Sequence, residues 1–577
     1  MKKCFISLMT ILAAMMLTTA LADETITLSP AGSTSSDRTV SIDGQTVTIT
    51  QEGTYIVTGE LTDGTLVIEV GKKEDVTLVL SGVSITNSTG AALSVVKADE
   101  VTIETASGTV NTLQSGEETA ESAETEDSEA ASGGALHSKD DLIFCGEGTL
   151  NVLGYLNNGI HCTADIEIES GTIHVTAVNH GIKGKKSVTV TGGQIDIASG
   201  KDGITSDEVD QAEKGFVRID GGEITITSDG DGISAETALT VTGGTVNIVS
   251  GGGSASVQSR TMSNGWWDFD TASDNTDGIS SKGLKAAQSI AISGGVLTID
   301  AADDALHSGD TITISGGEST LSTGDDGIHA DKSLTISGGT VTIPTSYEGL
   351  EAVEITISGG DIDITASDDG INANGGSSNF GFGGGFGGSR GGRSGEQTDE
   401  SSEEEEDSPI LIITGGKLTV TADGDGLDTN GDLRVEGGEI TVNGPTNSGN
   451  GAIDIGTENG GSAFISGGTV IALGASGMAE GFGDTSTQCA FLATMNTFTA
   501  GQTITIADSK GNVIYTGETT RSGSSVVFSS PDLTVGETYT ITIGQVTATV
   551  SQTDTVVGDG FSFGGFGGGG HGGHGGW

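Results

Sequence analysis

Short runs of alternating apolar and polar residues make up most of this chain. On either side of Gly338-Gly339, the apolar residues Ile336, Val341 and Ile343 alternate with serine and threonine, and Ile328 supplies a further apolar position. Alternation with period two predicts short strands that bury one face, and a glycine pair predicts a turn between them. We therefore expect these four apolar side chains to point inward.

The same unit recurs at nearly constant length. The glycine pairs that begin at Gly294, Gly316, Gly338 and Gly359 follow one another after 22, 22 and 21 residues. Self-similarity at this period is typical of a solenoid. A unit without a helical stretch and with about three short faces predicts an all-β fold, a right-handed parallel β-helix in which each coil buries its apolar side against the next.

One polar corner position can be followed through the repeat. In chain order it is occupied by Asn158, His180, Asp202, Asp231, Lys282, Asp304, Asp326, Glu348, Asp369 and Asp425. Most intervals are close to one coil, and the two longest are explained by insertions at residues 250–276 and 375–408. The carboxylates of this corner are therefore expected to stand in a column.

A column of carboxylates at the strand spacing of about 4.8 Å predicts shared cations, because like charges so close repel one another. Ca²⁺ takes six to eight oxygen ligands in tolerant geometry. The residues expected to bind calcium are Asp202, Asp229, Asp231, Asp303, Asp304, Asp325, Asp326, Glu348, Asp368, Asp369, Asp423 and Asp425. The alternative interpretation is that Asp-Gly corners only form turns and the carboxylates are solvated.

Two further groups of residues are candidates for contact with a ligand. Trp266 and Trp267, in the first insertion, could stack on sugar rings, or could only anchor their own loop. His307 and His329 lie beside the acidic column and are candidate ligand-binding residues.

Lysines also stand beside the acidic column. Lys282 and Lys285 register next to Asp304 and His307, so either lysine could serve as a catalytic base. A lysine between carboxylates would have its pKa raised, however, which favours a role as counter-ion.

The ends of the chain predict export and division into segments. The pattern of a signal peptide is formed by Met1-Lys2-Lys3, an apolar run and Ala20-Leu21-Ala22. A second apolar run of 18 residues, which would predict a membrane span, does not follow. The expected segments are a signal peptide at 1–22, a cap and first coils at 23–113, an acidic loop at 114–133, the β-helix at 134–480, a C-terminal antiparallel β unit at 481–552 and a disordered Gly-rich tail at 553–577.

The strong acidity of the chain excludes some partners. The formal net charge is -57 and the pI is about 4.1, whereas nucleic-acid binding needs clustered lysine and arginine. An anionic polymer could be held only where metal ions bridge it to the carboxylates of the protein.

The succession GDGISAETALTVTGG, DDALHSGDTITISGG, GDDGIHADKSLTISGG and SYEGLEAVEITISGG resembles a family of bacterial extracellular carbohydrate-binding parallel β-helix proteins, over roughly residues 23–480. The described member of that family binds acidic plant polysaccharide of the pectin type and cellulose, and is similar in fold to family 9 pectate lyases, with Ca²⁺ bound along the helix. The resemblance implies the fold, secretion, calcium and a polysaccharide ligand.

Three functions remain open from the sequence. The first is a secreted, calcium-dependent, non-catalytic binder of pectin-type or polygalacturonate polysaccharide. The second is a lyase that performs β-elimination, which needs a cation on the substrate carboxylate and a base such as Lys282 or Lys285. The third is a structural rod or adhesin associated with the cell surface, whose acidic coils only confer solubility.

Overall fold

The computed structural model describes residues 24–36, 38–117, 133–257, 280–374, 408–457 and 460–558. The chain divides into two compact units, one of residues 1–365 with 373–409 and the other of residues 366–372 with 410–577. In the described ranges the regular structure is almost entirely β-strand, and η1 (Ser254–Ser256) is a short 3₁₀ helix. Within those ranges no helix combines the length and the apolar character that crossing a membrane requires.

Strands of the first unit stack in three parallel ladders, and each coil contributes one strand to each ladder. The first ladder consists of β8 (Leu93–Lys97), β11 (Leu136–Ser138), β14 (Ile160–Cys162), β17 (Ile182–Gly184), β20 (Ile204–Ser206), β23 (Ile233–Ala235), β26 (Leu284–Ala286) and β29 (Leu306–Ser308). The second consists of β9 (Glu100–Thr105), β12 (Asp141–Gly146), β15 (Asp165–Ile168), β18 (Ser187–Val190), β21 (Phe216–Ile219), β24 (Ala238–Val241), β27 (Ser289–Ile292) and β30 (Thr311–Ile314).

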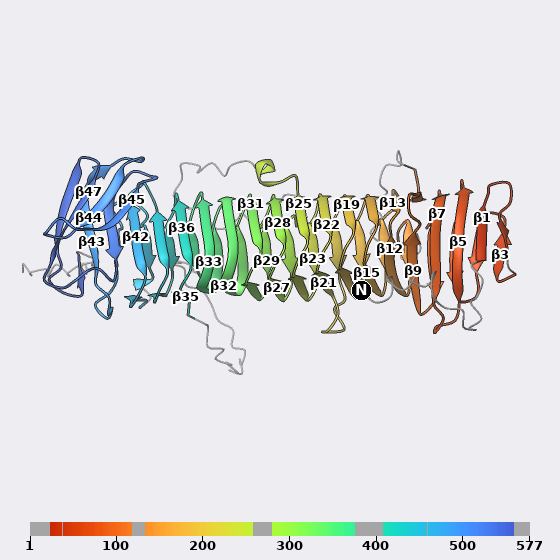
Figure 1. Cartoon of the computed structure of the whole chain (residues 1–577), viewed down its shortest axis with the longest axis horizontal. Helices are drawn as coiled ribbons and strands as arrows, with labels where there is room; N and C mark the ends of the chain where they lie inside the picture. Colours follow the sequence, from red (N-terminus) through yellow and green to blue (C-terminus); the bar gives the residue numbers. More distant parts are fainter. Residues whose placement is uncertain are drawn as a thin grey trace, which may run out of the picture. The chain divides into compact units, whose positions relative to one another are not determined.

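The third ladder consists of β10 (Val110–Ser115), β13 (Thr149–Gly154), β16 (Thr172–Ala177), β19 (Gln194–Ser199), β22 (Glu223–Ser228), β25 (Thr245–Ser250), β28 (Val296–Ala301) and β31 (Glu318–Thr323). Figure 1 shows the strands β19, β22, β25, β28 and β31 side by side. Next come β32 (Ile328–Thr345), which pairs with a strand of every ladder, and β33 (Leu350–Ala366), which pairs with β32. This register is consistent with the predicted β-helical solenoid.

The alternating pattern of the sequence explains the core. Ile328, Ile336, Val341 and Ile343 are fully buried, which confirms that they point inward. The serine and threonine residues between them lie on the outer faces, where their hydroxyls remain accessible. Burial of one apolar residue on another from coil to coil supplies most of the stabilisation of such a stack.

The second residue of each glycine pair adopts a conformation that favours glycine. Gly295, Gly317, Gly339 and Gly360 have φ between 86° and 92°, in the region that residues with a Cβ rarely enter. A Cβ on Gly317 would also lie 2.9 Å from the carbonyl oxygen of Gly295 in the previous coil. The glycine pair therefore combines a special backbone turn with close approach of neighbouring coils.

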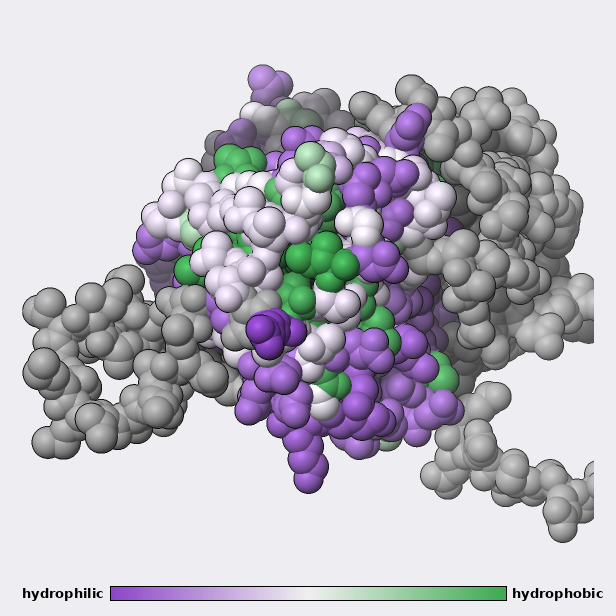
Figure 2. Space-filling model, turned by 90° about the vertical axis from the view of Figure 1, so that its right-hand side faces the viewer, coloured by the Kyte–Doolittle hydropathy of each residue, from purple (hydrophilic) through white to green (hydrophobic). Residues whose placement is uncertain are grey.

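The first strands of this unit include antiparallel pairs. They are β1 (Glu24–Leu28), β2 (Thr34–Ser35), β3 (Val40–Asp43), β4 (Thr46–Ile49), β5 (Gly53–Leu61), β6 (Thr65–Glu69) and β7 (Val76–Asn87). Strands β1 and β2, and likewise β3 and β4, are antiparallel, whereas β5 and β7 are parallel. Figure 2 views the end where β1 and β3 lie, and there the apolar residues are interspersed with hydrophilic ones. Hydrophilic residues on the outer face of a terminal repeat limit further stacking.

The second unit begins with the same three-ladder pattern and ends in antiparallel strands. Its parallel strands are β35 (Ile410–Ile413), β36 (Lys417–Ala422), β37 (Leu427–Thr429), β38 (Asp432–Val435), β39 (Glu439–Asn443), β40 (Ile453–Ile455), β41 (Ala463–Ile465) and β42 (Thr469–Gly474). Strand β34 (Ile371–Ala373) falls at the division between the two units.

Beyond β42 the pairing in the second unit becomes mainly antiparallel. Strand β46 (Gly523–Ser529) lies between β42 and β43 (Ala490–Phe498), and β49 (Val556–Val557) adds to β43 in parallel. A separate sheet has the order β45 (Val513–Glu518), β44 (Thr503–Ala507), β47 (Thr538–Ile543) and β48 (Val546–Ser551). Phe491, Phe528 and Tyr539 belong to the apolar core of this region.

Candidate functional site

The backbone of the first unit brings the predicted corner residues into a column. The amide of Gly283 donates to the carbonyl of Asp304 at 2.9 Å, and the amide of Ala305 donates to the carbonyl of Asp326 at 3.0 Å. The amide of Gly327 donates in the same way to Glu348 at 2.9 Å. Each corner therefore lies directly above the next, which confirms the register expected from the spacing.

Corner carboxylates also accept hydrogen bonds from the backbone of the following coil. Oδ1 of Asp202 accepts from the amide of Asp231 at 3.0 Å, and Oδ1 of Asp231 accepts from the amide of Lys282 at 2.8 Å. Oδ1 of Asp304 accepts from the amide of Asp326 at 3.2 Å. One oxygen of each carboxylate thus stabilises the turn, and the other oxygen can meet a cation.

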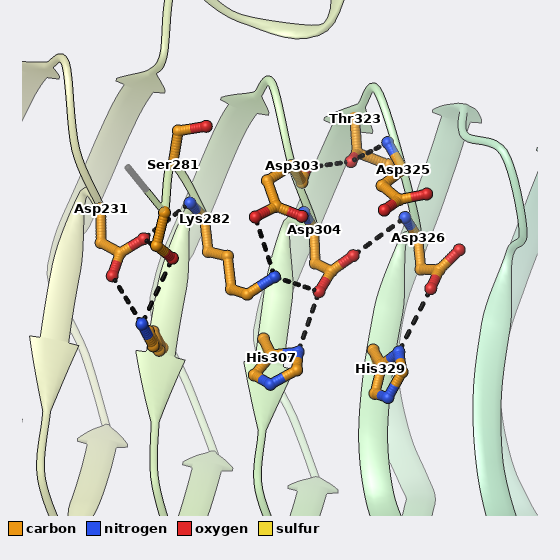
Figure 3. Close-up of polar contacts among 12 residues, drawn as sticks. Asp231, Ser281, Lys282, Asp303, Asp304, His307, Thr323, Asp325, Asp326 and His329 are labelled. Carbon is orange, nitrogen blue, oxygen red and sulfur yellow. Dashed lines mark hydrogen bonds and ion pairs between the residues drawn. The ribbon is translucent and has the colours of Figure 1, made fainter. Parts of the chain in front are cut away.

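Lys282 is held by two carboxylates of the next coil. Its Nζ lies 2.7 Å from Oδ2 of Asp304 and 2.9 Å from Oδ2 of Asp303, as Figure 3 shows. Burial alone would lower the pKa of Lys282, but the charges of Asp304 and Asp303 raise it above the ordinary value. This confirms the expected direction, and the ammonium acts as a counter-ion for both aspartates.

Histidines lie beside the same column, three residues after each corner. Nδ1 of His307 lies 2.8 Å from Oδ2 of Asp304. Burial raises the pKa of Asp304, but the hydrogen bond from His307 and the charge of Lys282 together bring it below the usual range.

His329 meets two carboxylates from different coils. Its Nδ1 lies 3.2 Å from Oδ2 of Asp326, which Figure 3 shows, and 2.8 Å from Oε2 of Glu351. Burial would lower the pKa of His329, but its hydrogen bonds to Asp326 and Glu351 raise it to about 11. Burial, followed by the charges of neighbouring acids such as Asp304, raises the pKa of Asp326.

Three of the predicted calcium ligands meet in the first unit. The carboxylates of Asp303, Asp304 and Asp325 each bring an oxygen within 4.8 Å of the other two. An all-oxygen donor set of this kind is chemically suited to Ca²⁺. Lys282 neutralises part of the charge of this group.

A second group of carboxylates meets in the second unit. Asp369, Asp425 and Asp428 each have an oxygen within 4.8 Å of the other two. Burial, then the charge of Asp368, raises the pKa of Asp369 to about 7. Burial is also the main cause that raises the pKa of Asp425 to about 6, with the charge of Asp454 adding to it. Partly buried carboxylates that repel one another in this way are suited to a shared cation.

The remaining predicted ligands have other surroundings. Oδ2 of Asp202 lies 3.3 Å from Nδ1 of His180, and Asp229 is exposed to solvent. Oδ2 of Asp231 lies 3.3 Å from Nζ of Lys285, which also contacts Oγ of Ser280. The corner of Asp202 and Asp231 is therefore engaged by basic side chains of the protein.

Asp423 pairs with Arg521, which also donates to the carbonyl of Ala422 at 2.9 Å. The carbonyl of Glu348 accepts a hydrogen bond from Gly327, which places Glu348 at the corner. The carboxylate that reaches His329, however, belongs to Glu351. Trp266 and Trp267 lie outside the described residues.

Two functional candidates were missed by following the corner alone. Glu351 and Asp428 stand three residues after the corners Glu348 and Asp425, and each is the second residue of the strand that follows, β33 or β37. Side chains at that position point outward beside the corner carboxylates. The spacing i, i+3 in each unit could have identified them.

The same outward position holds two neighbouring histidines in earlier coils. His137 and His161 are direct partners in β11 and β14, with ring centroids 5.1 Å apart. Burial, followed by the nearby charge of His137, lowers the pKa of His161 to about 4. Burial also lowers the pKa of His137. The outward row of this ladder thus holds a pair of half-buried imidazoles as well as charged side chains such as Lys183.

Known proteins are similar in sequence to this part of the chain. The family described as carbohydrate-binding domain-containing protein matches residues 43–327 and 324–370, more than half of the chain. The chain belongs to this family. The matched residues include the coils that carry Lys282, Asp304 and Asp326 and exclude Asp425 and Asp428.

Individual relatives match shorter regions. A carbohydrate-binding domain-containing protein of Acetivibrio thermocellus is 37% identical over 139 residues, which are 24% of this chain and 47% of that protein. The chain therefore spans about half the length of this relative. The structure of the polysaccharide lyase-like protein from C. thermocellum, as a gadolinium derivative, has 34% identity and a TM-score of 0.37, covering 40% of this chain and 92% of that one.

Proposed function

We propose that this protein is a secreted, calcium-dependent and non-catalytic binder of acidic plant cell-wall polysaccharide, of the pectin or polygalacturonate type. Membership of the carbohydrate-binding family supports a polysaccharide partner. The signal peptide pattern at residues 1–22 supports secretion. The right-handed sense of the coil belongs to the same proposal, because parallel crossovers strongly favour it.

The observation that carries the proposal is the group Asp369, Asp425 and Asp428. Its three carboxylates converge within 4.8 Å in a protein whose net charge is -57. A uronate polymer would be repelled by such a surface unless a cation lay between the two sets of carboxylates. Bound Ca²⁺ would supply positive charge to both.

The chain's own residues would hold and orient the ligand. Asp369, Asp425 and Asp428 would hold the ion, and Asp303, Asp304 and Asp325 form a second oxygen group that is partly neutralised by Lys282. The threonine and serine rows on the outer faces would hydrogen-bond sugar hydroxyls.

A lyase is the second candidate, because a lysine does stand beside the acidic column. Lys282 is a poor general base, however, since two carboxylates hold it protonated and raise its pKa. Lys285 contacts Asp231 and Ser280. A structural cell-surface rod is the third candidate, and it predicts no retention by any polysaccharide.

Affinity electrophoresis in gels containing polygalacturonate tests the proposal. Retardation in Ca²⁺ that vanishes with a chelator is the expected result. Retention of the protein by a neutral glycan in the presence of chelator would exclude bridging by calcium. Release of unsaturated sugar in the same mixture, abolished in Lys282→Ala, would establish the lyase in place of the binder.

A further inference from the structure

A mixed nitrogen and oxygen cluster lies beside the corner column of the first unit. Asp326 provides the corner carboxylate, His329 follows at i+3 in β32, and Glu351 of β33 is the direct register partner of His329. Because two coils supply the three side chains, the stacking of the solenoid fixes their separation.

The distances within this cluster match those between ligands of a single ion. Nδ1 of His329 lies 3.2 Å from Oδ2 of Asp326 and 2.8 Å from Oε2 of Glu351, and all three ligand atoms are within 4.8 Å of one another. Ligand atoms that each lie about 2.1 Å from a metal are roughly 3 Å apart from one another. Small side-chain adjustments would therefore suffice to surround an ion.

Two carboxylates of this cluster converge on one nitrogen of His329. Nδ1 of an imidazole carries a single hydrogen, yet it faces one carboxylate of Asp326 and one of Glu351. When both carboxylates are ionised, a divalent ion beside neutral His329 would neutralise their two negative charges.

The other nitrogen of His329 is oriented as in many metal-binding histidines. Nε2 lies 3.4 Å from Oδ1 of Asp331, in the same strand. A carboxylate near the second ring nitrogen favours the tautomer in which Nδ1 is free to bind a metal. His307, whose ring centroid is 4.9 Å from that of His329, provides a second imidazole in the preceding coil.

We propose that Asp326, His329 and Glu351 form a binding site for a first-row divalent transition metal of the Zn²⁺ type. The imidazole nitrogen distinguishes this site from the all-oxygen groups, because imidazole suits zinc and related metals whereas Ca²⁺ prefers oxygen ligands. Partial exposure of His329 and Glu351 leaves room for water as a further ligand. The proposal goes beyond the calcium-dependent binding of polysaccharide and does not depend on it.

Zn²⁺ titration of the full chain by calorimetry, in excess Ca²⁺, tests this site. The wild-type protein should bind one equivalent of Zn²⁺ that His329→Gln loses, and Asp331→Asn should bind it about tenfold more weakly. The matched control is His174→Gln, since His174 lies 2.9 Å from the single carboxylate of Asp196 and is more exposed. That control should retain the equivalent.

Visible absorption of bound Co²⁺ provides an independent measurement. Glu351→Gln, which keeps the size of the side chain, should change the spectrum of the wild-type complex and weaken binding at least tenfold. Glu351→Gln also tests the site if the His329→Gln variant does not fold in the presence of chelator. Zn²⁺ uptake that is equal in wild type, His329→Gln and Glu351→Gln would overturn the proposal, as would displacement of Zn²⁺ by an equal concentration of Ca²⁺.

Discussion

Nζ of Lys282 lies 2.7 Å from Oδ2 of Asp304. Lys282 occupies the corner position that is aspartate in the coils before and after it. The same ammonium lies 2.9 Å from Oδ2 of Asp303. A side chain of the protein thus supplies positive charge within the carboxylate column. This arrangement explains how part of the column can stack without a bound ion.

Lys282→Met should therefore destabilise the protein in chelator. Loss of one partner of a mostly buried pair leaves Asp304 without its counter-ion, at a cost of about 3 kcal/mol in the free energy of unfolding. Chemical denaturation measures this loss. Added Ca²⁺ should recover part of it, since Asp303, Asp304 and Asp325 would then offer oxygens without a competing ammonium.

Lys332→Met is the control for that change. Lys332 lies 3.0 Å from Asp310, but both side chains are well exposed, so its loss should cost less than about 1 kcal/mol. Equal effects of the two substitutions would contradict a special role for Lys282.

The double change Asp369→Asn and Asp425→Asn should remove Ca²⁺ binding by the group in the second unit. Asparagine keeps the acceptor for the backbone amides but lacks the negative charge that the ion requires. Calorimetry should show one fewer Ca²⁺ equivalent, and retention on polygalacturonate should fall with it.

Asp423→Asn is the matched control because Asp423 lies two residues from Asp425 and pairs with Arg521. It should retain the full number of Ca²⁺ equivalents. In chelator at pH 8 the double variant should be at least as stable as wild type, because two repelling carboxylates are neutralised. A double variant less stable than wild type would contradict repulsion between the carboxylates of Asp369 and Asp425. Its loss of Ca²⁺ binding could then not be assigned to the loss of these ligands.

His161 should make the protein sensitive to acid. Its pKa is near 4 in the folded protein, against an ordinary value of 6.5, so between these values the unfolded chain binds a proton that the folded protein does not. The contribution of His161 to the free energy of unfolding should therefore be complete above pH 6.5 and should decrease as the pH falls towards 4. Urea denaturation at pH 7 and pH 5 should show a smaller decrease for His161→Gln than for wild type. Identical decreases would show that this imidazole is not the source.

Gly317→Ala should destabilise the first unit. Its φ of +87° disfavours a Cβ, and that atom would lie 2.9 Å from the carbonyl oxygen of Gly295. Strain of this kind costs about 1–3 kcal/mol. Gly108→Ala tests the cost of the backbone conformation alone, because Gly108 has φ of +71° and open space around it. Its effect on stability should therefore be smaller than that of Gly317→Ala. Thermal unfolding compares the two.

The regular spacing of the sequence was sufficient to predict the stacking of the coils. Asp304 and Asp326 are one repeat apart, and the backbone hydrogen bonds place them in the expected register. The inward positions of Ile336 and Val341 followed from alternation, since a strand places successive side chains on opposite faces.

The chemistry of each site was harder to predict because it depends on the lateral reach of side chains between coils. Glu351 was missed since the series was followed through Glu348, although it is Glu351 that contacts His329. Asp423, a predicted calcium ligand, pairs with Arg521, which stands 98 residues later in the chain. Contacts of this separation have no signature in the local repeat.

The uniform step between coils has a consequence for how such a chain can change. Asp304 and Asp326 are separated by one complete circuit, and each circuit contacts chiefly the circuits on either side. Loss or duplication of one circuit would rejoin equivalent backbone positions and preserve every inward side chain. What would change is the number of outward groups in each row, so selection can lengthen or shorten the outward surface in steps of one repeat without redesigning the core.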